Sequence, residues 1–297
     1  MWQALLPALI NGEVKAVARS ISLVENEVPG YEAFLAGLPQ QNHAKIIGIT
    51  GPPGAGKSTL TDALLHELIT DDKRVAVLCV DPSSPFNLGA VLGDRIRMSQ
   101  WYLHPNIYIR SLATRGSVGG LNSKIIEITS LLKAAPFDYI IVETVGVGQS
   151  EIEIAGLADV TVVVLVPEGG DEVQTMKAGL MEIADIFVVN KSDRPDADAF
   201  VKALRLMLAP AFKQQREIAI IKTVASQQSG IAELYGVLKK LLTTATSGEK
   251  HNWLLAEKAY HLIQQGRMQD IDRKTLAEQI KKENHFNLYQ FVQRYTT

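Results

Sequence analysis

The stretch that decides the fold of this chain is IIGITGPPGAGKST, residues 46–59. An apolar, β-branched run leads into a glycine-rich loop of the form G-x-x-x-x-G-K-[ST], and a leucine-rich helical pattern follows. Glycines let successive backbone N–H groups turn toward an anion, and the helix N-terminus adds its positive dipole end. A chance match to the fixed positions is expected in about one chain in a hundred of this length. The stretch therefore predicts a strand, a nucleotide-binding P-loop and a helix.

Individual residues of this loop have distinct expected roles. Lys57 is placed to reach the β- and γ-phosphate oxygens, the Ser58 hydroxyl to ligand Mg²⁺, and Thr59 to support the α-phosphate. The residues expected to contact the nucleotide here are Gly51, Pro52, Pro53, Gly54, Ala55, Gly56, Lys57, Ser58 and Thr59.

A second motif, Asn190-Lys191-Ser192-Asp193, follows the apolar run 185–189 and indicates the base. At the carboxyl end of a parallel strand, Asp193 can accept hydrogen bonds from N1–H and the exocyclic amine of guanine, whereas adenine offers no matching pair. Alone, the tetrapeptide reads equally well as a polar loop with a helix N-cap, but its place about 135 residues after the P-loop makes it specific. We therefore predict Asn190, Lys191 and Asp193 as GTP contacts, with Ala225 and Ser226 on the other side of the base.

Carboxylates at the ends of other strands are candidates for the metal side of the site. Glu143 ends the run 139–142, where P-loop enzymes more usually have Asp, and its longer side chain is expected to act on Mg²⁺ through water. Asp81 and Asp94 are further candidates, with a helix cap or a surface ion pair as the alternative. The N–H of Gly146 is expected to sense the γ-phosphate. The predicted metal ligands are Ser58, Asp81, Asp94 and Glu143.

The bulk composition is that of a globular protein without partners held by charge. The 297 residues carry 30 basic and 32 acidic side chains, so neither nucleic acid nor an anionic membrane surface is implied as a partner. The longest apolar run, 160–166, is far shorter than the roughly 20 residues that span a bilayer. The N-terminal residues show a helical period rather than a signal peptide, and the single cysteine, Cys79, fits a reducing compartment. We expect a cytoplasmic protein.

Apolar runs alternate with helical segments from residue 45 onward. The candidate strands are 45–50, 75–80, 107–111, 139–142, 160–166, 185–189 and 218–224. Their continuous apolar character predicts an α/β fold with a mostly parallel sheet that is covered on both faces. We predict a helical extension at 1–44 that packs on the main domain or on a second subunit, a P-loop G domain at 45–245, and a helical dimerisation arm at 246–297.

With these motifs in view, the chain resembles the MeaB/ArgK family of G proteins, P-loop GTPases associated with methylmalonyl-CoA mutase. The resemblance covers nearly the whole chain and is carried by residues 51–59, VDPSS at 80–84, GDRIRM at 93–98, VETVGVGQSE at 142–151 and NKSD at 190–193. It implies a homodimer that couples GTP hydrolysis to the loading or protection of adenosylcobalamin in a client mutase. In the arm, only the helical pattern is shared.

The γ-phosphate end of the site is expected to be incomplete in the free protein. Gly146 is followed by Val147, which cannot orient an attacking water, and Gln149 lies two residues further on. The resemblance implies that Asp171 and Lys177, around an acidic loop and a helix start, report the nucleotide state to the client. The catalytic candidates are Lys57, Glu143, Gln149, Asp171 and Lys177. We expect a GTPase that is slow alone and stimulated by its partner.

Two other functions stay open. Some members of the family have been labelled as kinases of lysine, arginine and ornithine transport binding proteins, which would make this chain an ATP- or GTP-dependent kinase. A nucleotide-dependent scaffold without hydrolysis is the third possibility. Asp193 argues against ATP, and no H-R-D catalytic loop of the protein kinases is present. Ser58 together with Glu143 argues against an inactive scaffold.

Overall fold

The structure is a computed structural model that describes residues 1–39, 44–81, 98–114, 121–144, 150–167, 179–212, 218–244, 249–268, 271–283 and 287–296. It divides into two compact units, residues 1–251 and residues 252–297. Within these ranges no helix combines the length and the apolar character that crossing a bilayer requires.

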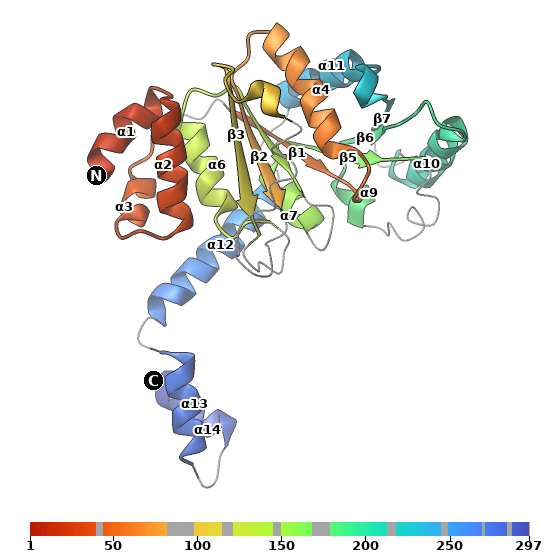
Figure 1. Ribbon diagram of the computed structural model, residues 1–297. Coiled ribbons are helices and arrows are strands. Elements are labelled where there is room, and N and C mark those ends of the chain that lie inside the picture. The colour runs from red at the N-terminus through yellow and green to blue at the C-terminus, as the bar shows by residue number, and fades with distance from the viewer. Residues whose placement is uncertain are drawn as a thin grey trace. The chain divides into compact units, whose positions relative to one another are not determined.

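A seven-stranded parallel sheet forms the centre of the first unit (Figure 1). Its strands are β1 (Lys45–Thr50), β2 (Val75–Asp81), β3 (Ile107–Ala113), β4 (Tyr139–Glu143), β5 (Val160–Leu165), β6 (Ile186–Val189) and β7 (Ala219–Lys222). The predicted parallel α/β fold is confirmed, and each predicted strand is present with ends that differ by at most two residues. The strands lie in the order β3-β2-β4-β1-β5-β6-β7, so β2, β3 and β4 lie on one side of β1 and β5, β6 and β7 on the other.

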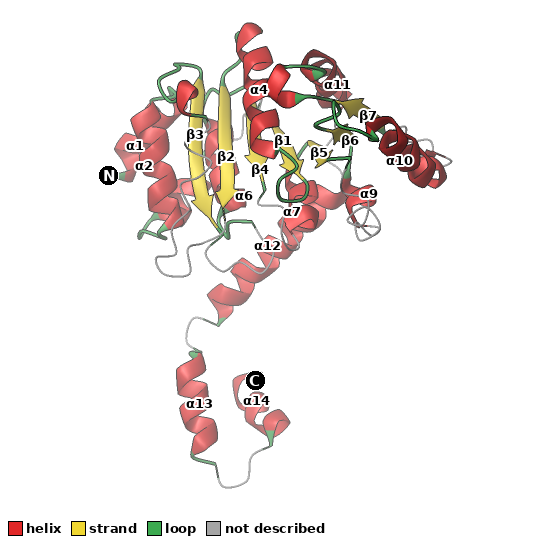
Figure 2. Cartoon of the chain, turned by 45° about the vertical axis from the view of Figure 1, so that its right-hand side comes forward, coloured by secondary structure: helices red, strands yellow, loops and turns green. Residues whose placement is uncertain are grey.

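Helices cover both faces of this sheet, as Figures 1 and 2 show. On one face, α4 (Lys57–Thr70) and α11 (Ile231–Thr244) share a core with side chains such as Ile47 and Ile49. On the other face lie α6 (Ile125–Ala134), α7 (Ser150–Leu157), α9 (Gly179–Ile183) and α10 (Ala197–Phe212), the last two around Phe187. Burial on both faces is the physical reason why the strands are apolar at consecutive positions.

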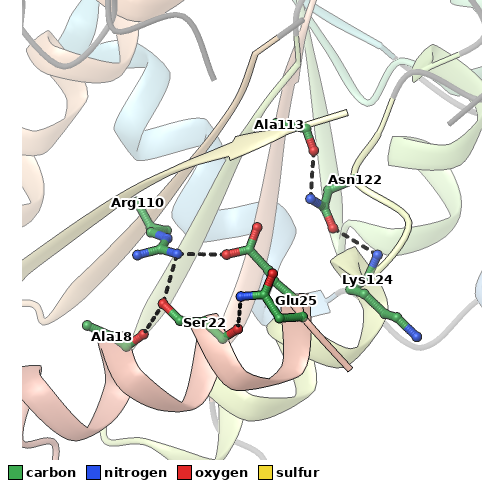
Figure 3. Close-up of polar contacts among 8 residues, drawn as sticks. Ala18, Ser22, Glu25, Arg110, Ala113, Asn122 and Lys124 are labelled. Atoms are coloured by element: carbon green, nitrogen blue, oxygen red, sulfur yellow. Dashed lines mark hydrogen bonds and ion pairs between the residues drawn. The ribbon is translucent and has the colours of Figure 1, made fainter. Parts of the chain in front are cut away.

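The N-terminal extension contacts the main domain within the same chain. It consists of α1 (Trp2–Ile10), α2 (Val14–Glu25) and α3 (Tyr31–Ala36), and both α2 and α3 contact α6. Polar contacts add to this packing. Figure 3 shows Arg110 of β3 reaching Ser22 and Glu25 of α2.

The second unit consists of α13 (Arg273–Lys281), α14 (Leu288–Thr296) and most of α12 (Glu249–Arg267). Asp272 caps α13 by accepting a hydrogen bond from the backbone N–H of Thr275 at 3.2 Å. The Asn287 side chain accepts bonds from the first backbone N–H groups of α14. Tyr295 of α14 donates to Gln279 of α13, so the two helices pair with each other.

Candidate nucleotide-binding site

The P-loop leaves β1 in the middle of the sheet, where the strand order changes direction. This is the place where open parallel sheets bind ligands, at the carboxyl ends of the strands. Gly51 and Gly56 have φ of +141° and +89°, which side chains other than glycine rarely adopt. A Cβ at Gly51 would lie 2.1 Å from the carbonyl oxygen of Val164, and one at Gly56 would lie 2.4 Å from Nδ2 of Asn190. Both glycines are therefore required by close packing as well as by conformation.

Lys57 begins α4 and turns its side chain back into the loop. Its ammonium group donates to the carbonyl oxygens of Gly51 and Pro52, at 2.8 and 3.1 Å. The residue is buried, so this charge is held in a region of low dielectric. Because a phosphate oxygen carries charge, it is a stronger acceptor than a backbone carbonyl. The ammonium group is thus placed to exchange from the loop carbonyls to a bound phosphate.

The metal-side candidates Ser58 and Glu143 come from separate motifs and lie in contact. The Ser58 hydroxyl donates to Oε1 of Glu143 at 2.6 Å. Thr61, one helical turn after Ser58, donates to Oε2 at 3.0 Å, and all three residues are buried. A hydroxyl and a carboxylate are the hard oxygen donors that suit Mg²⁺. Sequence analysis missed Thr61, although its i, i+3 spacing from Ser58 places both on one helix face.

Asn190 joins the base-side motif to the P-loop. Its Nδ2 donates to the carbonyl oxygen of Ala55 at 2.9 Å, and its Oδ1 accepts from the hydroxyl of Thr223 and the backbone N–H of Ala225, both at 3.1 Å. Lys191, at a φ of +55°, donates to the carbonyl oxygen of Gly54 at 2.8 Å. Three segments far apart in the sequence are therefore held together by one buried amide.

The other residues predicted to contact the nucleotide differ in their exposure to solvent. Asp193, Ser226, Pro53 and Gly54 are exposed, Pro52 and Thr59 are partly buried, and Ala55 and Ala225 are buried. Because Asp193 is exposed, its carboxylate is accessible to the guanine base of a nucleotide that binds from solvent.

Several predicted residues lie outside the described part of the chain: Asp94, Gly146, Gln149, Asp171 and Lys177. The side chain of Asp81, the last residue of β2, is likewise not described. Among the residues that are described, no three or more His, Cys, Asp or Glu side chains gather to form a metal site.

Comparison with known proteins identifies the family. The sequence model described as "Methylmalonyl Co-A mutase-associated GTPase MeaB" matches residues 17–279. The chain belongs to this family. The resemblance noted from its motifs is confirmed, and the match includes the P-loop, the Asn190 motif and most of the C-terminal helices. As a member of this family, the chain is a P-loop GTPase that binds guanine nucleotide and hydrolyses GTP.

Individual relatives agree with this family assignment. A protein of Pyrococcus abyssi is 44% identical over 286 residues, covering 95% of this chain and 83% of its own. GTPase ArgK of Escherichia coli is 36% identical over 250 residues, covering 80% and 75%. The crystal structure of an "LAO/AO transport system kinase" superposes with a TM-score of 0.68 at 26% identity, covering 99% of this chain and 96% of that one. The fold is thus shared with that protein over nearly the whole chain.

Proposed function

We propose that this MeaB-family GTPase uses Mg²⁺ and GTP to control the loading or protection of adenosylcobalamin in methylmalonyl-CoA mutase or a related mutase. The observation that carries this proposal is the family match over residues 17–279, whose description names association with that mutase. A Caenorhabditis elegans relative described as a methylmalonic aciduria type A homolog supports it, at 39% identity over 207 residues, 64% of this chain and 52% of its own. The buried single cysteine, Cys79, is compatible with work in the reducing cytoplasm.

The described side chains suit the binding and charge stabilisation of a nucleoside triphosphate. Lys57 would move its ammonium group from the carbonyls of Gly51 and Pro52 to the β- and γ-phosphates. Ser58 and Glu143 would hold Mg²⁺, and Asn190 would keep the base-side loop on the P-loop so that Asp193 can read guanine. When bound, Mg²⁺ would supply positive charge at the β- and γ-phosphate oxygens.

The same proposal includes stimulation by a partner. Val147 stands where a water-orienting glutamine is expected, so the chain by itself lacks a group at the position that usually directs the attacking water. A client that brings Gln149, Asp171 or Lys177 to the γ-phosphate would complete the site. We expect a gain below the 10³–10⁵ known for complementation by an arginine, since ordering a loop supplies position more than charge, and propose roughly tenfold.

Steady-state GTP turnover with and without an adenosylcobalamin-dependent mutase tests this function. The expected result is a slow rate alone and a clear rise with the mutase. The Lys57→Ala variant serves as the control for contaminating GTPase. A fast intrinsic rate that no mutase alters would contradict both the incomplete site and the role with a mutase.

A kinase is the second candidate, because the structural neighbour with a TM-score of 0.68 is described as a transport system kinase. GTP labelled in the γ-phosphate distinguishes the two in one experiment. Release of labelled inorganic phosphate supports the GTPase function. Transfer of label to an amino-acid-binding transport protein would support the kinase instead.

We also propose a homodimer that uses the C-terminal arm. The support lies in the large apolar side chains that the second unit leaves exposed, among them Trp253, Tyr260 and Tyr289 with exposed fractions of 75%, 67% and 82%. Sedimentation at micromolar protein is expected to give twice the mass of the chain. A monomer at that concentration, with and without nucleotide, would remove the dimer from the proposal.

A further inference from the structure

Thr61 is a buried hydroxyl residue of α4 that none of the nucleotide motifs includes. Its Oγ1 lies 3.0 Å from Oε2 of Glu143 and also 3.0 Å from the carbonyl oxygen of Lys57. The Ser58 hydroxyl lies 2.6 Å from the other carboxylate oxygen, Oε1. Each oxygen of the Glu143 carboxylate therefore contacts a different hydroxyl group of the same helix.

The Thr61 hydroxyl is not needed for the hydrogen bonding of the helix. The carbonyl oxygen of Lys57 lies four residues before Thr61, where the helical backbone already provides an N–H donor. A β-branched residue also has a lower helix propensity than the leucines around it. Because a carboxylate is a stronger acceptor than a backbone carbonyl, the bond to Glu143 is the contact that accounts for the hydroxyl.

Glu143 needs such a contact more than aspartate would at this position. Its side chain has one more methylene group and one more rotatable bond, so its carboxylate has more orientations to lose when it is fixed. A bond to Oε2 restricts the final rotation and leaves Oε1 directed at Ser58, the other metal-side residue.

We propose that Thr61 is a positioning residue, whose hydroxyl orients the Glu143 carboxylate and thereby strengthens Mg²⁺ binding in the nucleotide complex. This inference rests on the proposed function, in which Ser58 and Glu143 hold Mg²⁺. Hydrogen-bond partners of metal ligands typically change metal affinity by about 10–100-fold. Because Ser58 and the phosphates still hold the ion, we expect the lower end of that range.

Release of a fluorescent GDP analogue, measured in excess Mg²⁺ and in EDTA, tests the inference without relying on turnover. In the wild type, Mg²⁺ is expected to slow release. Thr61→Val keeps the volume and removes the hydroxyl, and it should reduce this slowing by about tenfold with the EDTA rate unchanged. Thr61→Ser should retain the wild-type effect. Thr129→Val is the matched control, because Thr129 is a buried helical threonine of α6 that bonds to the carbonyl of Ile125.

The possible results separate the positioning role of Thr61 from the metal assignment of the proposed function. If Mg²⁺ slows release equally in Thr61→Val and the wild type, or if Thr61→Ser is as impaired as Thr61→Val, the positioning role is wrong and the proposed function stands. A Thr61→Val variant that releases nucleotide faster in EDTA as well has a loosened site, which also overturns the role. If Mg²⁺ has no effect on the wild type, the metal assignment of the proposed function fails, and this inference fails with it.

A Glu143→Asp background sharpens the test. The shorter carboxylate is withdrawn from Thr61 by about one carbon–carbon bond, roughly 1.5 Å, which breaks a 3.0 Å hydrogen bond. Thr61→Val should then add no further loss of Mg²⁺ dependence. A full additional loss in this background would show that Thr61 acts by a route other than Glu143.

Discussion

The polar residues at the P-loop and those beneath the N-terminal helices make different kinds of contact. At the P-loop, the contacts shown for Lys57 are with the neutral carbonyls of Gly51 and Pro52, and those shown for Glu143 are with hydroxyl groups. Beneath the N-terminal helices, Arg110 of β3 pairs with the carboxylate of Glu25 at 2.7 Å and with the hydroxyl of Ser22 at 3.1 Å (Figure 3).

Lys124 at the start of α6 extends this second cluster. Its ammonium group lies 2.7 Å from a carboxylate oxygen of Glu27 and 4.9 Å from the ring centre of Tyr31. Burial by itself lowers the pKa of Lys124, but the bond to Glu27 and the charge of Glu127 outweigh it and raise the pKa above 10.5. The side chain therefore stays charged, and it ties α6 to the N-terminal helices.

The two regions therefore differ in what their polar contacts do. Those of Lys57 and Glu143 lie where the nucleotide is expected, and those of Arg110 join a strand to a helix. Breaking a buried pair of opposite charges by removing one partner costs about 3–5 kcal/mol, because the other charge is left without compensation. A hydrogen bond from an ammonium group to an anionic phosphate is stronger than one to a neutral carbonyl, so the bonds from Lys57 to Gly51 and Pro52 can be exchanged for bonds to a phosphate. The P-loop is thus prepared for binding, and the contacts of Arg110 and Lys124 serve attachment.

The largest expected effect is that of Lys57→Ala on GTP turnover. Loss of a buried cation beside the developing phosphate charge should lower the turnover rate by about 10²–10³-fold. The nucleotide-free protein should melt only a few degrees lower, since two neutral carbonyls lose a donor worth about 1–2 kcal/mol. A variant that turns over GTP at the wild-type rate would break the comparison, because Lys57 would then be structural only.

Arg110→Met should lower the stability of the protein and leave GTP turnover unchanged, the reverse of what is expected for Lys57→Ala. We expect a loss of about 3 kcal/mol in unfolding free energy, because the buried Glu25 carboxylate loses its contact with Arg110, and we expect GTP turnover per folded molecule to be unchanged. The double variant Arg110→Met/Glu25→Leu removes both charges and should recover most of the loss. Urea unfolding measures the first quantity and steady-state kinetics the second. If Arg110→Met lowered GTP turnover and left stability unchanged, the contact between Arg110 and α2 would contribute to GTP hydrolysis.

Asp193→Asn sharpens the comparison at the exposed edge of the nucleotide site. The variant exchanges a carboxylate acceptor for an amide that pairs with xanthine, so preference should move from GTP toward XTP. A hydrogen bond to a charged group is worth about 1.5–3 kcal/mol, so GTP affinity should fall roughly tenfold or more. Competition binding measures the change. Asp196→Asn on the same exposed loop is the control, and an equal effect of both variants would remove the base assignment.

The smallest effect on stability is expected for the exposed ion pair between Asp71 and Lys239. Asp71 accepts hydrogen bonds from Lys239 and Tyr235, at 3.1 and 2.9 Å, and these bonds lower the pKa of its carboxyl. A lowered folded-state pKa means that the contribution is present at neutral pH and is lost as pH falls through that value. Asp71→Asn should therefore be slightly less stable than the wild type at pH 7 and equal to it in acid. A difference that stays constant across pH would exclude ionisation of Asp71 as its cause.

Much of the fold and part of the nucleotide site were predictable from local patterns. The strands were recognised because burial on both sheet faces leaves a continuous apolar run in the sequence. The P-loop was recognised because its backbone geometry requires glycines at set positions, and the structure shows a backbone carbonyl against Gly51. Thr61 was missed because a single threonine within a leucine-rich helix has no pattern of its own.

The sequence by itself determined which segments become strands and helices, where the phosphate loop lies, and which family the chain belongs to. These properties depend on spacing along the chain, and such spacing is local. The tertiary structure decided the strand order, with β1 between β4 and β5, and it decided that Glu143 meets both Ser58 and Thr61. It also decided that Arg110 meets Glu25, 85 residues earlier in the chain. The physical reason is that a hydrogen bond or ion pair between distant residues depends on packing, and packing is a property of the folded chain as a whole.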